Sequence, residues 1–148
     1  MKNTTEPEPY YRIIEHTADL RLEIYGKDPE ALFVNAARAL FAVLVPLEEG
    51  QAVPERRRQT FELEGGDWAD LMVDWLREVL YIWNGEMQLL SRLEMHHLSE
   101  TRLKATLFTG DFDPRRHHPD KEIKAVTYHQ IEVAPDAKGW RARVLFDV

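Results

Sequence analysis

Two aspartates near opposite ends of the chain are the residues best suited to chemistry. Asp19 ends the segment 16–19, which begins with His16, and Asp147 precedes Val148, whose α-carboxylate supplies further oxygens. Such hard oxygen ligands suit Mg²⁺, Ca²⁺ or Mn²⁺ rather than zinc. If the final strand lies beside the first, Asp19 and Asp147 could converge on one ion. On the residues alone, two strand-end aspartates in solvent are the commoner arrangement.

Two side chains of the predicted strand 123–133 could act beside these carboxylates. Pairing back from the predicted hairpin turn places Val126 near Asp147, so Lys124 lies close to the chain end, where its ammonium could neutralise a carboxylate. An outward-facing strand lysine is the ordinary alternative. His129 shares a predicted face with apolar neighbours, and a histidine there is more often a hydrogen-bonded core residue than a base or ligand.

A long polar loop is predicted at residues 110–122. It holds Asp113 and the two cations Arg115 and Arg116, and it is the local basic cluster of the second half of the chain. Loops of this length in small domains are often functional. The two arginines could contact phosphate or an acidic partner surface, and a solvated loop stiffened by prolines is an equally good alternative.

The residue types give little support to an enzymatic reaction. The chain has no cysteine, and its six histidines show no zinc-binding spacing. The sequence also lacks a glycine-rich phosphate loop and a nucleophile elbow. Carboxylates without a plausible nucleophile define no reaction. A metal-dependent phosphoesterase built on Asp19, Asp147 and His129 is therefore disfavoured.

The composition narrows the choice of partners. The formal net charge is −7, which excludes binding of a phosphate backbone by bulk attraction. We expect RNA to be reached only through a partner or a local basic patch, and we expect no binding of DNA. No apolar run approaches the roughly 20 residues of a membrane span, and the start lacks the apolar core of a secretion signal. These features favour a cytoplasmic protein without membrane contact.

The elements that must position these residues follow from hydrophobic periodicity and capping signals. Helices are predicted from the cap Asp28, with Pro29 in the first position, to residue 45, and from the cap Asp67 to about residue 83. Strands are predicted at residues 10–14, 20–25, 59–65, 88–98, 101–109, 123–133 and 140–148.

The resulting order is β-β-α-β-α-β-β-β-β. Because hairpins dominate, we expect an α+β fold, with a mainly antiparallel sheet and two helices packed on one face. Residues 1–9 are polar and rich in proline, which predicts a flexible N-terminal arm, and residues 10–148 are predicted to form a single domain.

Several segments together resemble the archease family in order and spacing. They are His-Thr-Ala-Asp at 16–19, Leu-Met-Val-Asp-Trp-Leu at 71–76, Phe-Asp-Pro at 112–114 with His117, Glu-Ile-Lys-Ala-Val-Thr-Tyr-His at 122–129, and Phe-Asp-Val at 146–148. The resemblance covers residues 11–148. Family members often end in isoleucine, so Val148 is a departure, which matters little if the ligand is the α-carboxylate.

The resemblance implies an α+β fold and a protein cofactor rather than an enzyme. Archeases assist the tRNA-splicing ligase that joins RNA ends using GTP and Mn²⁺, by promoting guanylylation of the ligase's histidine and repeated turnover. Some members are linked to tRNA methyltransferases as chaperone-like modulators, which is the alternative function. The family's metal-binding positions fall on Asp19, Asp147 and Val148. Residues expected to face the partner are His16, Lys124, His129, Asp113, Arg115 and Arg116.

Overall fold

The computed structural model describes residues 9–15 and 18–148, so residues 1–8 of the predicted N-terminal arm lie outside the described part. The elements are β1 (Tyr11–Glu15), β2 (Asp19–Gly26), α1 (Pro29–Leu44), β3 (Arg57–Glu64), α2 (Trp68–Asn84), β4 (Gln88–Leu98), β5 (Arg102–Asp111), β6 (Ala125–Asp136) and β7 (Gly139–Asp147). This order and the α+β class confirm the prediction from the sequence.

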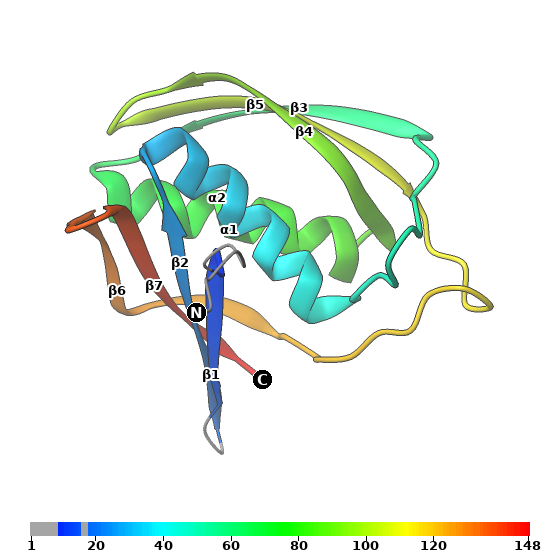
Figure 1. The fold of residues 1–148 in the computed structure, drawn as a ribbon. Helices are drawn as coiled ribbons and strands as arrows, with labels where there is room; N and C mark the ends of the chain where they lie inside the picture. The colour runs from blue at the N-terminus through cyan, green and yellow to red at the C-terminus, as the bar shows by residue number, and fades with distance from the viewer. Residues whose placement is uncertain (1–8, 16–17) are drawn as a thin grey trace, which may run out of the picture.

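The strands form two antiparallel sheets, with the orders β1-β2-β7-β6 and β3-β5-β4. Both helices lie between the sheets and contact strands of each (Figure 1). The structure therefore differs from the expected single sheet with helices on one face. The cause is visible in α1, whose buried side chains surround the helix axis and need cover on two sides: Leu32, Phe33, Ala36, Ala37, Ala39, Leu40, Phe41, Val43 and Leu44.

Both predicted helix caps are present. The Asp28 carboxylate accepts from the Ala31 N–H at 2.8 Å, and the Asp67 carboxylate accepts from the Asp70 N–H at 2.9 Å. Each bond satisfies an amide that has no partner within its helix. The Asp70 side chain reaches back to the N–H of Gly66 rather than to that of the cap itself. Among the described residues, no helix has the length and apolar character needed to span a membrane.

The core is centred on aromatic side chains from both helices. Trp75 of α2 is fully buried, and its indole N–H donates to the Phe33 carbonyl of α1 at 2.9 Å. The Trp68 ring lies 5.8 Å from the Phe33 ring and 5.5 Å from that of Trp140 on β7. These contacts join α1, α2 and the four-stranded sheet into one unit.

A bulge in β6 overturns the uniform alternation predicted for residues 123–133. The strand pairs with β7 on both sides of the bulge, but the register shifts between Thr127 and Glu132, and Gln130 adopts a φ of 55°. Extra residues in one strand reverse the direction of the side chains beyond them. His129 is consequently exposed, whereas Ile123, which was predicted to share its face, is buried.

The buried Trp75 bond predicts a measurable stability difference. Trp75→Phe leaves the Phe33 carbonyl without a donor in a core closed to water, so the free energy of unfolding should fall by about 1–3 kcal/mol more than packing loss alone explains. The matched variant is Trp83→Phe, which also loses a mostly buried indole but no hydrogen bond of the described structure. Equal losses for both variants in urea unfolding would contradict this account.

Candidate functional site

The register of β2 against β7 brings the two predicted aspartates together. Asp19 is the direct antiparallel partner of Asp147, and the next pair inward is Leu20 with Phe146, both buried. Directly opposed residues have Cβ atoms about 4.5–5.5 Å apart, so the two side chains start from adjacent points at one end of the sheet. The final strand reaches Asp19 by pairing with β2 rather than β1, which lies on the far side of β2.

A hollow of about 180 Å³ adjoins Asp19, and Asp147 is not among the described residues that line it. Its lining residues are Glu15, Asp19, Leu20, Asp120, Lys121, Glu122 and Val148. Three of its carboxylates were not predicted as site residues, because they come from the end of β1 and from the irregular segment after β5. Their spacing in the sequence carries no signal, and only the loop length pointed to that segment.

The far wall of the hollow is held by the end of α1. The N–H of Asp120 donates to the Leu44 carbonyl at 2.8 Å, and the N–H of Lys121 donates to the Val43 carbonyl at 3.2 Å. The last carbonyls of a helix have no partner within it, so they can fix a passing chain in this way. The acidic segment is thereby positioned opposite the β2 and β7 ends.

One ion pair spans the hollow. Lys121 Nζ lies 2.7 Å from Glu15 Oε1, and this hydrogen bond raises the pKa of Lys121 above its ordinary value. Because Glu15 is exposed and Lys121 is partly exposed, the pair contributes little to stability. It does occupy Glu15, so this carboxylate is already engaged by a cation of the chain.

Lys124 lies beside the chain end, as predicted. Its backbone N–H donates to the Asp147 carbonyl at 2.7 Å, and its side chain is exposed. The residue opposite Asp147 is Ala125, one position before the predicted Val126. The approach to the strand is fixed by α2, where the Asn84 amide donates to the Ile123 carbonyl at 2.9 Å.

The remaining predicted residues lie away from the hollow or outside the described part. His16 falls in the undescribed residues 16–17. His129 is exposed at the β6 bulge, where its N–H donates to Thr127 Oγ1 at 3.2 Å, and it does not line the hollow.

The Asp113 loop is held by hydrogen bonds within its own turn. Asp113 Oδ1 accepts from the Arg115 N–H at 3.0 Å, and its own N–H donates to Nδ1 of the buried His117 at 2.9 Å. Arg115 and Arg116 are exposed at this turn. The loop therefore presents two cations to solvent, and neither lines the carboxylate hollow.

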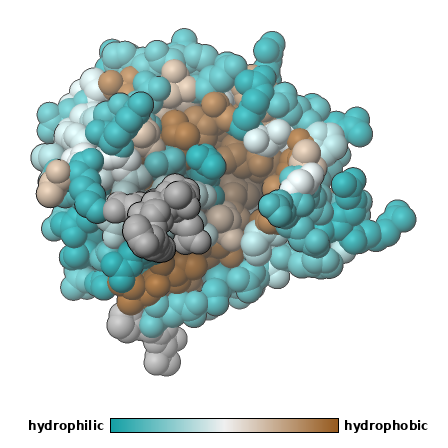
Figure 2. Space-filling view, viewed as in Figure 1, coloured by the Kyte–Doolittle hydropathy of each residue, from teal (hydrophilic) through white to brown (hydrophobic). Residues whose placement is uncertain are grey.

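A larger hollow lies elsewhere and is mostly apolar. Apolar surface gathers over α1 and β4, and a space of about 580 Å³ there is lined in part by Phe41, Val45 and Leu90 (Figure 2). None of the predicted site residues belongs to it. Its size alone does not connect it with the carboxylate chemistry.

The donor set fits a hard divalent cation only with a third ligand. In the parts of the chain that the structure describes, no three His, Asp or Glu side chains form a group able to hold a metal ion. Asp19 and Asp147 offer only oxygens, which suits Mg²⁺, Ca²⁺ or Mn²⁺. Val148, which lines the same hollow, is the candidate for a further donor.

Comparison with known proteins agrees with the resemblance drawn from the motifs. The model of the Archease protein family (MTH1598/TM1083) matches residues 11–148. Protein archease of Methanosarcina mazei is 34% identical over 142 residues, covering 93% of this chain and 95% of the relative. Protein archease of Pyrococcus abyssi is 34% identical over 140 residues, covering 90% and 95%.

A solved structure shows the same architecture. The solution structure of Methanobacterium thermoautotrophicum protein 1598 matches with a TM-score of 0.72 and 29% identity, covering 94% of this chain and 99% of that one. Sequence motifs, the family model and the fold thus agree over nearly the whole length. This chain belongs to the archease family.

Proposed function

We propose that this protein is a cofactor of a GTP- and Mn²⁺-dependent tRNA-splicing RNA ligase, acting in the cytoplasm. It promotes guanylylation of the ligase's histidine and lets the ligase turn over repeatedly in tRNA splicing and RNA repair. Membership of the archease family supports this role. The observation that carries the proposal is the direct pairing of Asp19 with Asp147 at the ends of the two central strands of the sheet.

The carboxylate pair would serve as the working part of the site. Asp19, Asp147 and the carboxylate of Val148 would hold one divalent cation, which supplies neutralisation of the charge on transferring phosphoryl groups. The register fixes the separation of the two aspartates before any partner binds. Such preorganisation lowers the cost of assembling the site on the ligase.

Lys124 would tune the same site. Its backbone bond to the Asp147 carbonyl keeps the lysine at the chain end, and its exposed ammonium can reach either a neighbouring carboxylate or a phosphate. A flexible point charge suits both tasks. Removing the Lys124 ammonium should change the metal affinity of the site less than removing an aspartate does, since the lysine is not a ligand.

An accessory role fits the residues of the hollow better than independent catalysis. The described residues that line it carry carboxylates, a lysine and apolar groups, and these include no histidine, serine or threonine that could serve as nucleophile. His129, the base of the phosphoesterase alternative, lies at the bulge instead. A chaperone-like role towards a tRNA methyltransferase would use other surfaces and would not need the aspartates.

The central prediction concerns ligase guanylylation. Asp19→Asn and Asp147→Asn should each reduce the stimulation of guanylylation by at least about tenfold, because each removes a charge that the site needs. The assay follows transfer of labelled GMP to the ligase, with and without this protein. Glu62→Gln, which removes an exposed carboxylate from the other sheet, is the matched control and should keep full stimulation. Undiminished stimulation by both aspartate variants would exclude the carboxylates from the mechanism.

A second prediction concerns the cation itself. Calorimetry should show one Mn²⁺ or Ca²⁺ bound per chain, with the affinity lowered about tenfold or more by Asp147→Asn. Adding one glycine after Val148 turns its carboxylate into an amide and should weaken binding similarly. Unaltered affinity in the extended variant would remove Val148 from the ligand set while leaving the aspartates in place.

A further inference from the structure

No described helix or strand covers the outer face of the four-stranded sheet (Figure 1). Both helices pack against the inner face, where Leu22, Ile24 and Val144 are buried (Figure 1). Because side chains alternate along a strand, the residues between these positions point outward. Polar groups from strands far apart in the sequence therefore share one surface.

Arginines collect around a single carboxylate on this face. The strand register places Arg12 of β1 and Arg143 of β7 on either side of Glu23 of β2. Glu23 is mostly buried, and its Oε2 lies 3.9 Å from Arg21 Nε and 3.5 Å from Arg143 Nε. Neither Nε has a hydrogen-bond acceptor among the described residues. One carboxylate cannot neutralise this set of guanidinium groups, so positive charge remains.

An aromatic hollow continues the basic surface. Tyr25 follows Glu23 by two residues on β2 and pairs with Arg141 on β7. A space of about 570 Å³ beside Tyr25 is lined in part by Trp140, Arg12 and Lys27.

Cations outnumber carboxylates over the whole area. The cations are Arg12, Arg21, Lys27, Lys138, Arg141 and Arg143, and the carboxylates are Glu23, Glu132 and Asp136; Asp19 and Asp147 share this face but lie at the far end of β2 and β7, outside the area. We call this area the basic sheet face. It carries positive charge in a chain whose formal net charge is −7.

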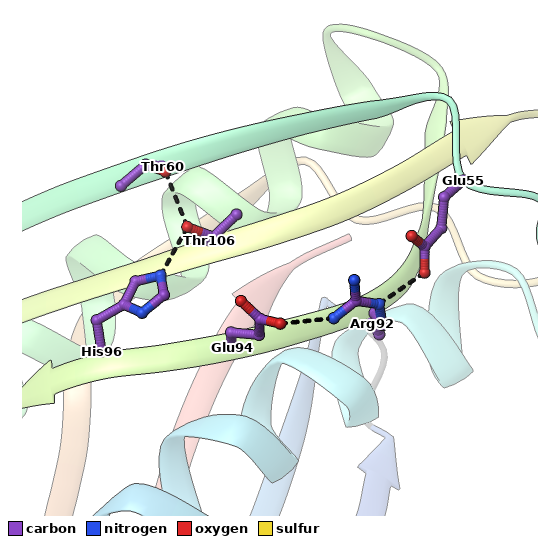
Figure 3. A network of polar contacts seen from close by, with 6 residues as sticks. All are labelled: Glu55, Thr60, Arg92, Glu94, His96 and Thr106. Atoms are coloured by element: carbon purple, nitrogen blue, oxygen red, sulfur yellow. Dashed lines mark hydrogen bonds and ion pairs between the residues drawn. The ribbon is translucent and has the colours of Figure 1, made fainter.

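The outer face of the other sheet lacks this excess. Its Arg92 is held by Glu55 at 2.7 Å and by Glu94 at 2.8 Å (Figure 3). The same guanidinium lies 3.7 Å from the centre of the Phe108 ring. Arg141 of the basic sheet face meets one carboxylate, Glu132 at 2.6 Å, whereas Arg92 is held by two carboxylates and an aromatic ring and so offers little to an anion.

We propose that the basic sheet face binds a single strand of nucleic acid. Phosphates would contact Arg12, Lys27 and Arg141, and a base would stack on Tyr25 in the adjoining hollow. Cationic grooves with stacking aromatic rings are the means by which proteins bind single strands without reading their sequence. This assignment does not depend on the carboxylate site, and it replaces the expectation that RNA is reached only through a partner.

Fluorescence anisotropy with a labelled strand of about 12 uridines tests the proposal. The triple variant Arg12→Gln, Lys27→Gln, Arg141→Gln keeps the arginines that balance Glu23. It should bind at least about tenfold more weakly at low salt, and the slope of log K against log salt should fall by about 2, at roughly 0.7 for each lost phosphate contact.

The matched control removes equal charge from the other sheet. Arg58→Gln, Arg102→Gln, Lys104→Gln should change the affinity less than about twofold. Equal weakening by the two triple variants, or no saturable binding by the native protein, would overturn the proposal. The Arg12, Lys27 and Arg141 variant should still stimulate ligase guanylylation. Failure of the nucleic-acid proposal is therefore distinguishable from failure of the proposed function.

The stacking contact has its own test. Tyr25→Leu should weaken binding of the uridine strand about tenfold, whereas Tyr25→Phe, which keeps the ring, should bind like the native protein. A matched strand of thymidines shows whether the sugar contributes, and equal binding assigns the contact to phosphates and bases alone. Heparin bound as tightly as the strand, with no effect of Tyr25→Leu, would contradict a nucleic-acid site.

Discussion

The antiparallel register of β2 against β7 is the constraint on which the rest of the structure depends. Successive inward pairs, Leu20 with Phe146 and Leu22 with Val144, are buried against the helices. A slip of one residue would turn these side chains to solvent, so burial fixes the register strongly. The same register sets Asp19 against Asp147 at one end of the strands and Gly26 against Trp140 at the other. Both the carboxylate site and the basic sheet face are consequences of one hydrophobic interaction.

This register separates charge within an acidic molecule. At one end, Asp19 lies with Asp120 and Glu122 around the small hollow. Along the outer face towards the other end, arginines surround the partly buried Glu23. The net charge of the whole chain does not describe either surface, since charges separated by more than about 8–10 Å are largely screened in physiological salt. Local arrangement therefore decides which partners each surface attracts.

Much of the fold was predictable because local signals agree with the tertiary structure. Asp28 and Asp67 cap their helices as their positions indicate, and the hairpin order follows from alternation and turns. The division into two sheets was not predicted, because it depends on how two apolar helices are covered rather than on any one segment. The β6 bulge was missed for a related reason: extra residues between Thr127 and Glu132 leave no mark in the alternation of side chains. The residue types suggested a metal role for Asp19 and Asp147, the motif resemblance favoured it, and it stays a prediction, whereas the carboxylates of the irregular segment required coordinates.

The shared ion site of the two aspartates is tested most directly by paramagnetic broadening by Mn²⁺ in amide NMR spectra of the native protein. One bound ion at the β2 and β7 ends should broaden the amide signals of residues 19–20, 120–122 and 147–148 first, because relaxation by a paramagnetic ion falls steeply with distance. The signals of the basic sheet face near Tyr25 and Trp140 should stay sharp at the same ion concentration. Broadening that begins at another group of residues, or that spreads evenly over the chain, would contradict a shared ion between the two aspartates.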